Sequence, residues 1–418
     1  MPKMRIKMIK PSRLSSFSEK EVLSNQELLT EILLRLPVKS LGRCKCVSKK
    51  WSSLITSPEF TRLRVPCFNP ARALFLHCSS LLTNPFHQFV SLSLENPIQA
   101  PFQKLSFIHD PSGIRILQSC NGLLLCCSFR AHEPNRNYYI YNPTTQQFIT
   151  LPKPGGKRQI SKVILGMKLA FDPWKSPHYK VVCTRRSEKA PEHYQIEIYS
   201  SETMKWRVSG PPFPARYDIG FEYTGVYWNG AIYWECGDNS LRFNVEHEKL
   251  EKFPTPCIGR SWDDEESRVA YYGESYGYLH LVQVHSRQKL SFYNIYEMKN
   301  DGTEWFLKYQ VNVEDVVAAF PHMIRHYLEP TDWHYLAMAV LCVVRGEKEE
   351  DDFMVLHIPR MVIRYNLRDY TFYKLCEFGN STNDDDQFEE EDEVPVTLVS
   401  LEFGWFSAFQ YIESLFCL

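Results

Sequence analysis

The chain has 418 residues, of which 44% are hydrophobic and 23% are charged, and its mean hydropathy is −0.33. This composition is typical of a folded protein and excludes a wholly disordered chain and a multi-span membrane protein. No apolar run reaches the roughly 18 residues of a membrane-spanning helix, and the basic N-terminus lacks the apolar segment of a secretory signal. The 13 cysteines are therefore expected to be reduced thiols in the cytoplasm or nucleus.

Charge divides the chain into two regions. Residues 1–64 contain 14 Lys or Arg and 5 Asp or Glu, whereas the rest contains 34 basic and 44 acidic residues. Opposite balances predict two modules, and an aromatic content of 14% favours β structure in the larger one. The expected fold class is α+β, with a flexible basic tail over 1–18, a helical domain over 19–64, a linker over 65–73 and an all-β domain over 74–418.

The first predicted helix begins at Ser24, which lies three residues before Glu27 in the spacing of a capping box. Apolar residues then recur at helical spacing until Pro37 ends the helix. This stripe consists of Leu29, Ile32, Leu33 and Leu36, and Leu28 widens it.

Two shorter helices are predicted to follow. Leu41, Cys44 and Val47 supply the apolar face of the second, and Ser48 is expected to cap the third. The inner face of the third helix would consist of Trp51, Leu54 and Ile55. The first helix carries more apolar surface than two short neighbours can cover, so this surface packs either on the β domain or on a partner protein. The cysteines of this region lack the spacing of a zinc site.

The stretch from Leu23 to Leu41, with the block LRLPVKSL, and the following block CVSKKW resemble a plant F-box. Gly42 and Cys44 replace larger apolar residues that are common in the family, which implies a looser second helix. The resemblance implies that these helices bind a Skp-type adaptor and, through it, a cullin–RING ubiquitin ligase. The adaptor-binding residues that it implies are Leu28, Ile32, Leu36, Pro37, Leu41, Val47 and Trp51.

A hairpin pattern recurs five times in the larger region. Each copy has an alternating strand with an aromatic anchor, a polar turn and a returning strand that carries an aromatic residue or leucine. Asn229-Gly230, between two aromatic-rich strands, is the strongest hairpin signal. Two hairpins per repeat, with steps of 44 to 72 residues between anchors, predict a β-propeller. The five anchors are Tyr141, Tyr199, Phe243, Tyr293 and Tyr365. The copies lead, in the same order, to Phe148, Trp206, Leu250 with Phe253, Trp305 and Phe372 on the returning strands.

A sixth blade is expected from Leu74–Leu76 and Phe89–Leu92, closed by Val396–Val399 near the C-terminus. Such closure would remove the open edges of the ring. The β region also resembles the F-box-associated domain of plant F-box proteins. The blocks that carry this resemblance are Ser119–Leu123, Tyr141–Thr145 and Gly225–Gly230.

One motif has the form of a catalytic site. Gly273–Gly277 matches the G-x-S-x-G nucleophile elbow, with Ser275 at its centre. That elbow needs a strand, a sharp turn and a helix, but the strand-like run Tyr278–Val282 follows here, so a hairpin turn is favoured. Phosphate-loop, HExxH and EF-hand spacings are absent, and neither a cofactor nor a metal ion is expected. The acidic segment 380–393 is interpreted as a solvated loop, with steering of a basic target as the alternative.

Together the two resemblances imply a substrate-recognition subunit of a Skp–cullin–F-box ubiquitin ligase, which binds the adaptor through its helices and an unknown target through its propeller. Such a subunit is not itself an enzyme, and neither nucleic acid nor a membrane is an expected partner. The basic residues of the tail are spaced rather than clustered, which disfavours a role for the tail in nucleic-acid binding or nuclear targeting. Two alternatives stay open: a propeller enzyme that uses Ser275 or a metal ion in the central channel, and an adaptor-binding protein that acts outside the ligase.

Overall fold

The chain divides into two compact units, residues 1–64 and residues 65–418, which are described separately. The predicted tail 1–18, the acidic segment 380–393 and the expected closing strand Val396–Val399 lie outside the described residues. The computed structural model describes residues 25–36, 38–57, 59–60, 63, 70–78, 86–102, 104–131, 135–155, 163–188, 190, 192–214, 219–256, 267–378, 401 and 403–418.

The first unit contains three short helices. They are α2 (Gln26–Leu34), α3 (Val38–Lys45) and α4 (Lys49–Thr56). Ser48 caps α4 as predicted, because its hydroxyl accepts a hydrogen bond of 3.2 Å from the backbone N–H of Trp51. The predicted cap of α2 was wrong by one residue. The Asn25 side chain accepts hydrogen bonds from the N–H groups of Glu27 and Leu28, at 2.9 and 3.2 Å, and it thereby satisfies the donors assigned to Ser24.

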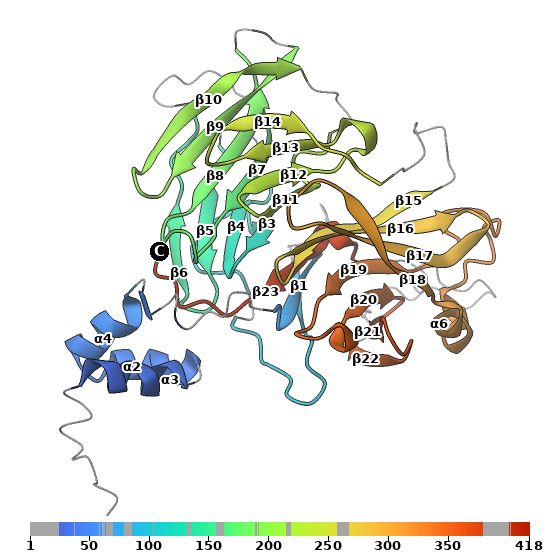
Figure 1. Cartoon of the computed structure of the whole chain (residues 1–418), viewed down its shortest axis with the longest axis horizontal. Coiled ribbons are helices and arrows are strands. Elements are labelled where there is room, and N and C mark those ends of the chain that lie inside the picture. The colour runs from blue at the N-terminus through green and yellow to red at the C-terminus, as the bar shows by residue number, and fades with distance from the viewer. Residues whose placement is uncertain are drawn as a thin grey trace, which may run out of the picture. The chain divides into compact units, whose positions relative to one another are not determined.

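The second unit is a six-bladed β-propeller (Figure 1). Five blades are four-stranded antiparallel sheets. Blade 1 contains β3 (Ile114–Cys120), β4 (Leu123–Ser128), β5 (Tyr138–Asn142) and β6 (Gln147–Thr150). Blade 2 contains β7 (Ile164–Ala170), β8 (Lys180–Arg186), β9 (His193–Ser200) and β10 (Lys205–Pro214). Blade 3 contains β11 (Gly225–Trp228), β12 (Ala231–Trp234), β13 (Leu241–Asn244) and β14 (Lys249–Lys252).

The remaining blades complete the ring. Blade 4 contains β15 (Arg268–Ser275), β16 (Tyr278–Ser286), β17 (Lys289–Met298) and β18 (Trp305–Asn312). Blade 5 contains β19 (Ala339–Val344), β20 (Phe353–Ile358), β21 (Met361–Asn366) and β22 (Phe372–Glu377). Blade 6 contains β1 (Ala73–Cys78), β2 (Phe86–Ser91) and β23 (Ala408–Tyr411). Short helical turns are η1 (Gly237–Asn239), α6 (Glu314–Ala319), η2 (Pro321–Met323), η3 (Glu349–Asp351) and η5 (Trp405–Ser407).

The five aromatic anchors occupy equivalent positions, which confirms the predicted repeat. Each lies on the third strand of its blade and is at most 5% exposed. Four are followed five positions later by a residue with a positive φ angle, which places the same turn in each hairpin. In blade 4 the strands are longer and contain a bulge, so Trp305, which begins the returning strand, pairs with Met298 rather than with the anchor Tyr293. The observed partners of the anchors on the fourth strands are Phe148, Trp206, Leu250, Val311 and Phe372.

The core lies between blades rather than inside one sheet. One buried cluster joins Ile140 of blade 1 to Val181 of blade 2, and another joins Ile198 of blade 2 to Phe243 of blade 3. Each blade is therefore stabilised by the apolar faces of its neighbours, which is the physical reason for a closed ring.

Among the described residues, the C-terminal strand that closes the ring is β23. β23 pairs with β1, from Ala73 with Tyr411 to Leu76 with Ala408, so blade 6 is built from both ends of the second unit. The residues after β23 continue along blade 1, where the Asn142 side-chain amide donates hydrogen bonds to the carbonyl oxygens of residues 414 and 416. The two ends of the ring are thereby held together.

Candidate functional site

The first candidate site is the exposed face of α2. Leu29 and Leu33 are buried, whereas Leu28 and Ile32 are 39% and 47% exposed. The latter two are four residues apart, so they lie on one face of the helix, and the single predicted stripe separates into an inner and an outer face.

The other residues predicted to bind an adaptor differ in exposure. Val47 follows α3 and is 64% exposed, while Leu36 and Trp51 are partly buried. Leu41 is fully buried, so it supports the helices rather than contacting a partner directly. Pro37 lies outside the described residues.

The second candidate site is a cavity of about 430 Å³ along the innermost strands of the propeller. Strands β3, β7, β11, β15 and β23 all contribute to its lining, so five of the six blades meet there. Three of its lining aromatic side chains are exposed: Trp174 by 37%, Tyr223 by 54% and Phe406 by 57%. The rings of Tyr223 and Phe406 meet edge to face, with centroids 6.3 Å apart. Exposed aromatic rings beside a cavity are typical of a binding surface.

A buried amine and a largely buried carboxyl group line this cavity. The Lys168 side chain, on β7, is 2% exposed and donates a hydrogen bond of 2.8 Å to the carbonyl oxygen of Glu222. Burial lowers the pKa of Lys168 to about 7, although the Glu222 carboxylate opposes the shift. Burial also raises the pKa of Glu274, on β15, to about 7, although the backbone N–H of Gly277 donates a hydrogen bond of 2.6 Å to its Oε1.

The other charged groups of the lining have partners. Lys175 lies 3.6 Å from Asp172, and Glu413 lies 3.1 Å from Arg72. Within the part of the chain that the structure describes, no Lys, Arg or His forms an ion pair with Glu274. Its carboxyl group is therefore the acidic group of the lining that a ligand would neutralise.

Neither Lys168 nor Glu274 was singled out from the sequence. A lysine within the otherwise apolar strand Ile164–Ala170 was the signal that pointed to Lys168. Glu274 lies inside the G-x-S-x-G match, a motif that predicts a role for Ser275 and none for Glu274. Residues of five different blades form the cavity, and no local pattern shows that they meet.

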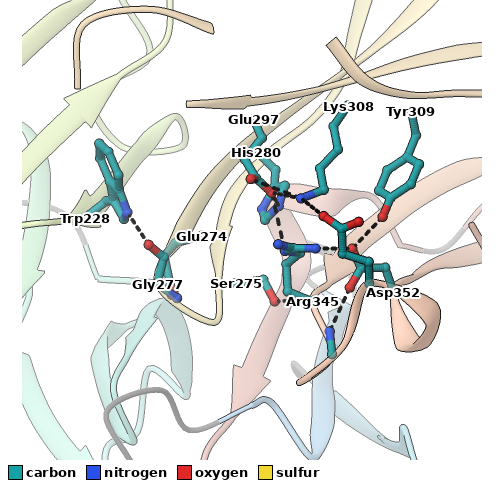
Figure 2. A network of polar contacts seen from close by, with 12 residues as sticks. Trp228, Glu274, Ser275, Gly277, His280, Glu297, Lys308, Tyr309, Arg345 and Asp352 are labelled. Carbon is teal, nitrogen blue, oxygen red and sulfur yellow. Dashed lines mark hydrogen bonds and ion pairs between the residues drawn. The ribbon is translucent and has the colours of Figure 1, made fainter. Parts of the chain in front are cut away.

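The structure excludes a nucleophile elbow at Ser275. This residue ends β15, the turn is Tyr276-Gly277 with φ angles of 53° and 81°, and a strand rather than a helix follows. The Asn121-Gly122 and Asn229-Gly230 turns have the same pair of positive φ angles, so the match is a third copy of the hairpin turn. The side chain of Ser275 is 1% exposed, and its hydroxyl accepts a hydrogen bond of 3.0 Å from the backbone N–H of Arg345 (Figure 2).

Replacing Ser275 with alanine is expected to lower the free energy of unfolding by about 1–2 kcal/mol, because the buried N–H of Arg345 loses its acceptor. Urea unfolding, followed by tryptophan fluorescence, measures this change. Wild-type Ser275 is also expected to resist a fluorophosphonate probe. Rapid labelling of Ser275 would contradict its assignment as a structural residue.

Figure 2 also shows a buried ionic network between blades 4 and 5. Glu297 lies 3.2 Å from His280, 3.1 Å from Lys308 and 3.4 Å from Arg345. Burial would raise the pKa of Glu297, but these cationic and hydrogen-bonding neighbours outweigh burial and hold the pKa below its usual range. Arg345 also contacts Asp352, which accepts a hydrogen bond of 2.8 Å from the Tyr309 hydroxyl. This network connects two blades and is therefore structural.

Across the described ranges, no three His, Cys, Asp or Glu side chains gather in a way that could hold a metal ion. No helix in those ranges is both long enough and apolar enough to cross a membrane.

Comparison with known proteins assigns both units. Residues 25–63 match the F-box domain family, and residues 74–311 match the F-box associated beta propeller domain family. The chain is 36% identical to F-box protein At5g07610 of Arabidopsis thaliana over 394 residues, which cover 88% of this chain and 89% of that protein. It is 30% identical to the putative F-box protein At5g62660 of the same plant, over 60% of this chain and 66% of that protein.

Proposed function

The chain belongs to the plant F-box proteins that carry an F-box-associated β-propeller, and from this premise we propose that it is the substrate-recognition subunit of a Skp–cullin–F-box ubiquitin ligase. One observation carries the proposal. An F-box, with Leu28 and Ile32 exposed on α2, is followed in the same chain by a closed propeller whose cavity is lined by exposed aromatic side chains. The helices dock the Skp-type adaptor, and the propeller holds the target.

The proposed mechanism is positional. Binding of adaptor and target to one chain raises the effective concentration of a target lysine near the ubiquitin-charged enzyme of the ligase. No residue of this chain performs covalent chemistry in this scheme. The buried position of Ser275 supports this view, because a substrate carbonyl would not reach its hydroxyl.

We propose that the protein acts in the cytoplasm or the nucleus. In the part of the chain that the structure describes, ten cysteines are in the reduced thiol form rather than in disulfides, and five of them are buried. This state is typical of a reducing compartment.

The test is affinity purification of the tagged full-length chain from plant cells, followed by identification of adaptor and cullin. Replacing Ile32 with aspartate places a charge on the outer face of α2 and is expected to lower adaptor recovery at least tenfold. The matched control is Val208→Asp on β10, where the wild-type side chain is 56% exposed, and this variant should retain the adaptor.

Three outcomes separate the proposals. Undiminished adaptor recovery with Ile32→Asp would contradict the assignment of this face. Recovery of adaptor without cullin would support an adaptor-binding role outside the ligase. Loss of both partners in Ile32→Asp, but not in Val208→Asp, would support the receptor.

A further inference from the structure

We infer that the propeller cavity binds the side chain of a lysine or arginine that a basic segment of the target protein presents, with Glu274 as its counter-ion. The description of the occupant as a target protein rests on the proposed function. The preference of the cavity for a cation is a property of the chain alone.

The geometry of the lining fits such a side chain. Glu274 stands beside the Tyr276-Gly277 turn, where Trp228 of the neighbouring blade donates a hydrogen bond of 2.7 Å to the Gly277 carbonyl oxygen (Figure 2). Gln410 of β23 donates a hydrogen bond of 2.7 Å to the Glu274 carbonyl oxygen. Bonds from two other blades thus fix the backbone on both sides of this carboxyl group, which is the preorganisation that a binding residue needs.

Aromatic residues supply the second part of the fit. Tyr223 and Phe406 are exposed at the cavity, and Trp228 lies in its lining. The methylene stem of a lysine or arginine packs against such rings, and its charged head is attracted to their faces. A carboxylate among aromatic rings therefore favours a cation with an apolar stem over a small hydrated ion.

Charge decides between a cationic and an anionic occupant. Lys168 is almost fully buried, and its ammonium group already donates to the Glu222 carbonyl oxygen, whereas Glu274 is partly exposed and has no cationic partner among the described residues. The sequence after residue 64 has ten more acidic than basic residues, so its long-range field also attracts a basic segment. Both observations favour a cation.

The pH dependence of binding follows from the same two groups. Between pH 6 and pH 8 the Glu274 carboxyl ionises and the Lys168 ammonium loses its proton, because both pKa values lie near 7. Both changes make the cavity more negative, so cation binding is expected to strengthen as pH rises. Burial raises the pKa values of Cys120 and Tyr271 well above this window, so both remain neutral. The remaining charged residues of the lining are Asp172 with Lys175, and Glu413, which pairs with Arg72. Lys168 also faces Glu222, which forms an ion pair with Arg115.

The experiment is a calorimetric and ligand-observed NMR titration of the purified full-length chain. The probes are N-acetyl-arginine amide, its neutral isostere N-acetyl-citrulline amide, and inorganic phosphate. The arginine derivative is expected to bind at least tenfold more tightly than the citrulline derivative, and at least threefold more tightly at pH 8 than at pH 6. In Glu274→Gln, which keeps the hydrogen-bond acceptor for Gly277, its affinity should fall to that of the citrulline derivative.

Two further variants make the result specific. Glu251→Gln, on the outer strand β14, changes net charge equally and should leave both affinities unchanged. Phe406→Ala should weaken both organic probes by a similar factor, because it removes ring contact and no charge. Equal binding of the arginine and citrulline derivatives, binding of phosphate alone, no binding of any probe, or an unchanged affinity in Glu274→Gln would each overturn the inference.

Adaptor capture separates this inference from the proposed function. Glu274→Gln should recover as much adaptor as the wild-type chain. If the wild-type chain binds the arginine derivative but captures no adaptor, the receptor proposal fails and the cation preference of the cavity stands. If it captures adaptor and cullin but shows no cation preference, the inference fails and the receptor proposal stands.

Discussion

Replacing Asp352 with alanine is expected to lower the free energy of unfolding of the propeller by about 3–5 kcal/mol. Asp352 is fully buried and accepts hydrogen bonds from the Arg345 side chain, the Tyr309 hydroxyl and a backbone N–H. Removing its carboxylate leaves these donors buried and Arg345 with less compensating charge. The energy lost comes mainly from the uncompensated groups rather than from the pair itself.

Urea unfolding of the two variants Asp352→Ala and Asp369→Ala measures this effect. Asp369 lies in the exposed turn before β22 of the same blade, where its side chain accepts hydrogen bonds from the backbone N–H and the hydroxyl of Thr371. We expect the control to lose less than about 1 kcal/mol. A loss in Asp352→Ala as small as in the control would show that the network between blades 4 and 5 contributes little.

The parts of the fold that the sequence predicted are those with local signals. Ser48 caps its helix because a hydroxyl before an apolar run is sufficient for the cap. The five aromatic anchors could be found because each hairpin has its own turn and a period of two, which fixes the register independently of the other blades.

The parts that were missed depend on distant residues. β23 has only four residues and follows the short helical turn η5, so the local sequence shows no hairpin pattern there, and its pairing with β1 is what makes it a strand. α6 is a short helix between blades 4 and 5, and the strand pattern of the surrounding sequence does not predict it. Asn and Ser are about equally good helix N-caps, so the local sequence could not decide between Asn25 and Ser24.

The two candidate sites also differ in whether the local sequence predicts them. Leu28 and Ile32 are neighbours on one helix, so their shared face was predictable from periodicity. Lys168, Glu274 and Gln410 come from three different blades, and only closure of the ring brings them to one cavity.

The second large effect is a gain in stability. Replacing Glu274 with glutamine is expected to raise the free energy of unfolding by about 2 kcal/mol at pH 8. Burial raises the pKa of this carboxyl from its ordinary value of 4.5 to about 7, so the folded state holds the proton more tightly than the unfolded state. The stability of the wild-type chain therefore falls as pH rises from about 4.5 to 7, and it loses no more above that range from this group. Glutamine does not titrate, so the advantage of the variant should be small at pH 5 and complete at pH 8.

Urea unfolding of wild type, Glu274→Gln and Glu251→Gln at pH 5 and pH 8 tests whether the free energy of unfolding changes in this direction. Hydrogen bonding to Lys249 and the charge of Lys249 lower the pKa of Glu251, so its replacement should give no gain at the higher pH. A residue whose removal stabilises the fold while abolishing cation binding is held in place for binding rather than for stability. If Glu274→Gln is instead less stable than wild type at pH 8, the carboxylate stabilises the fold. It would then be a structural group rather than the counter-ion of a basic target.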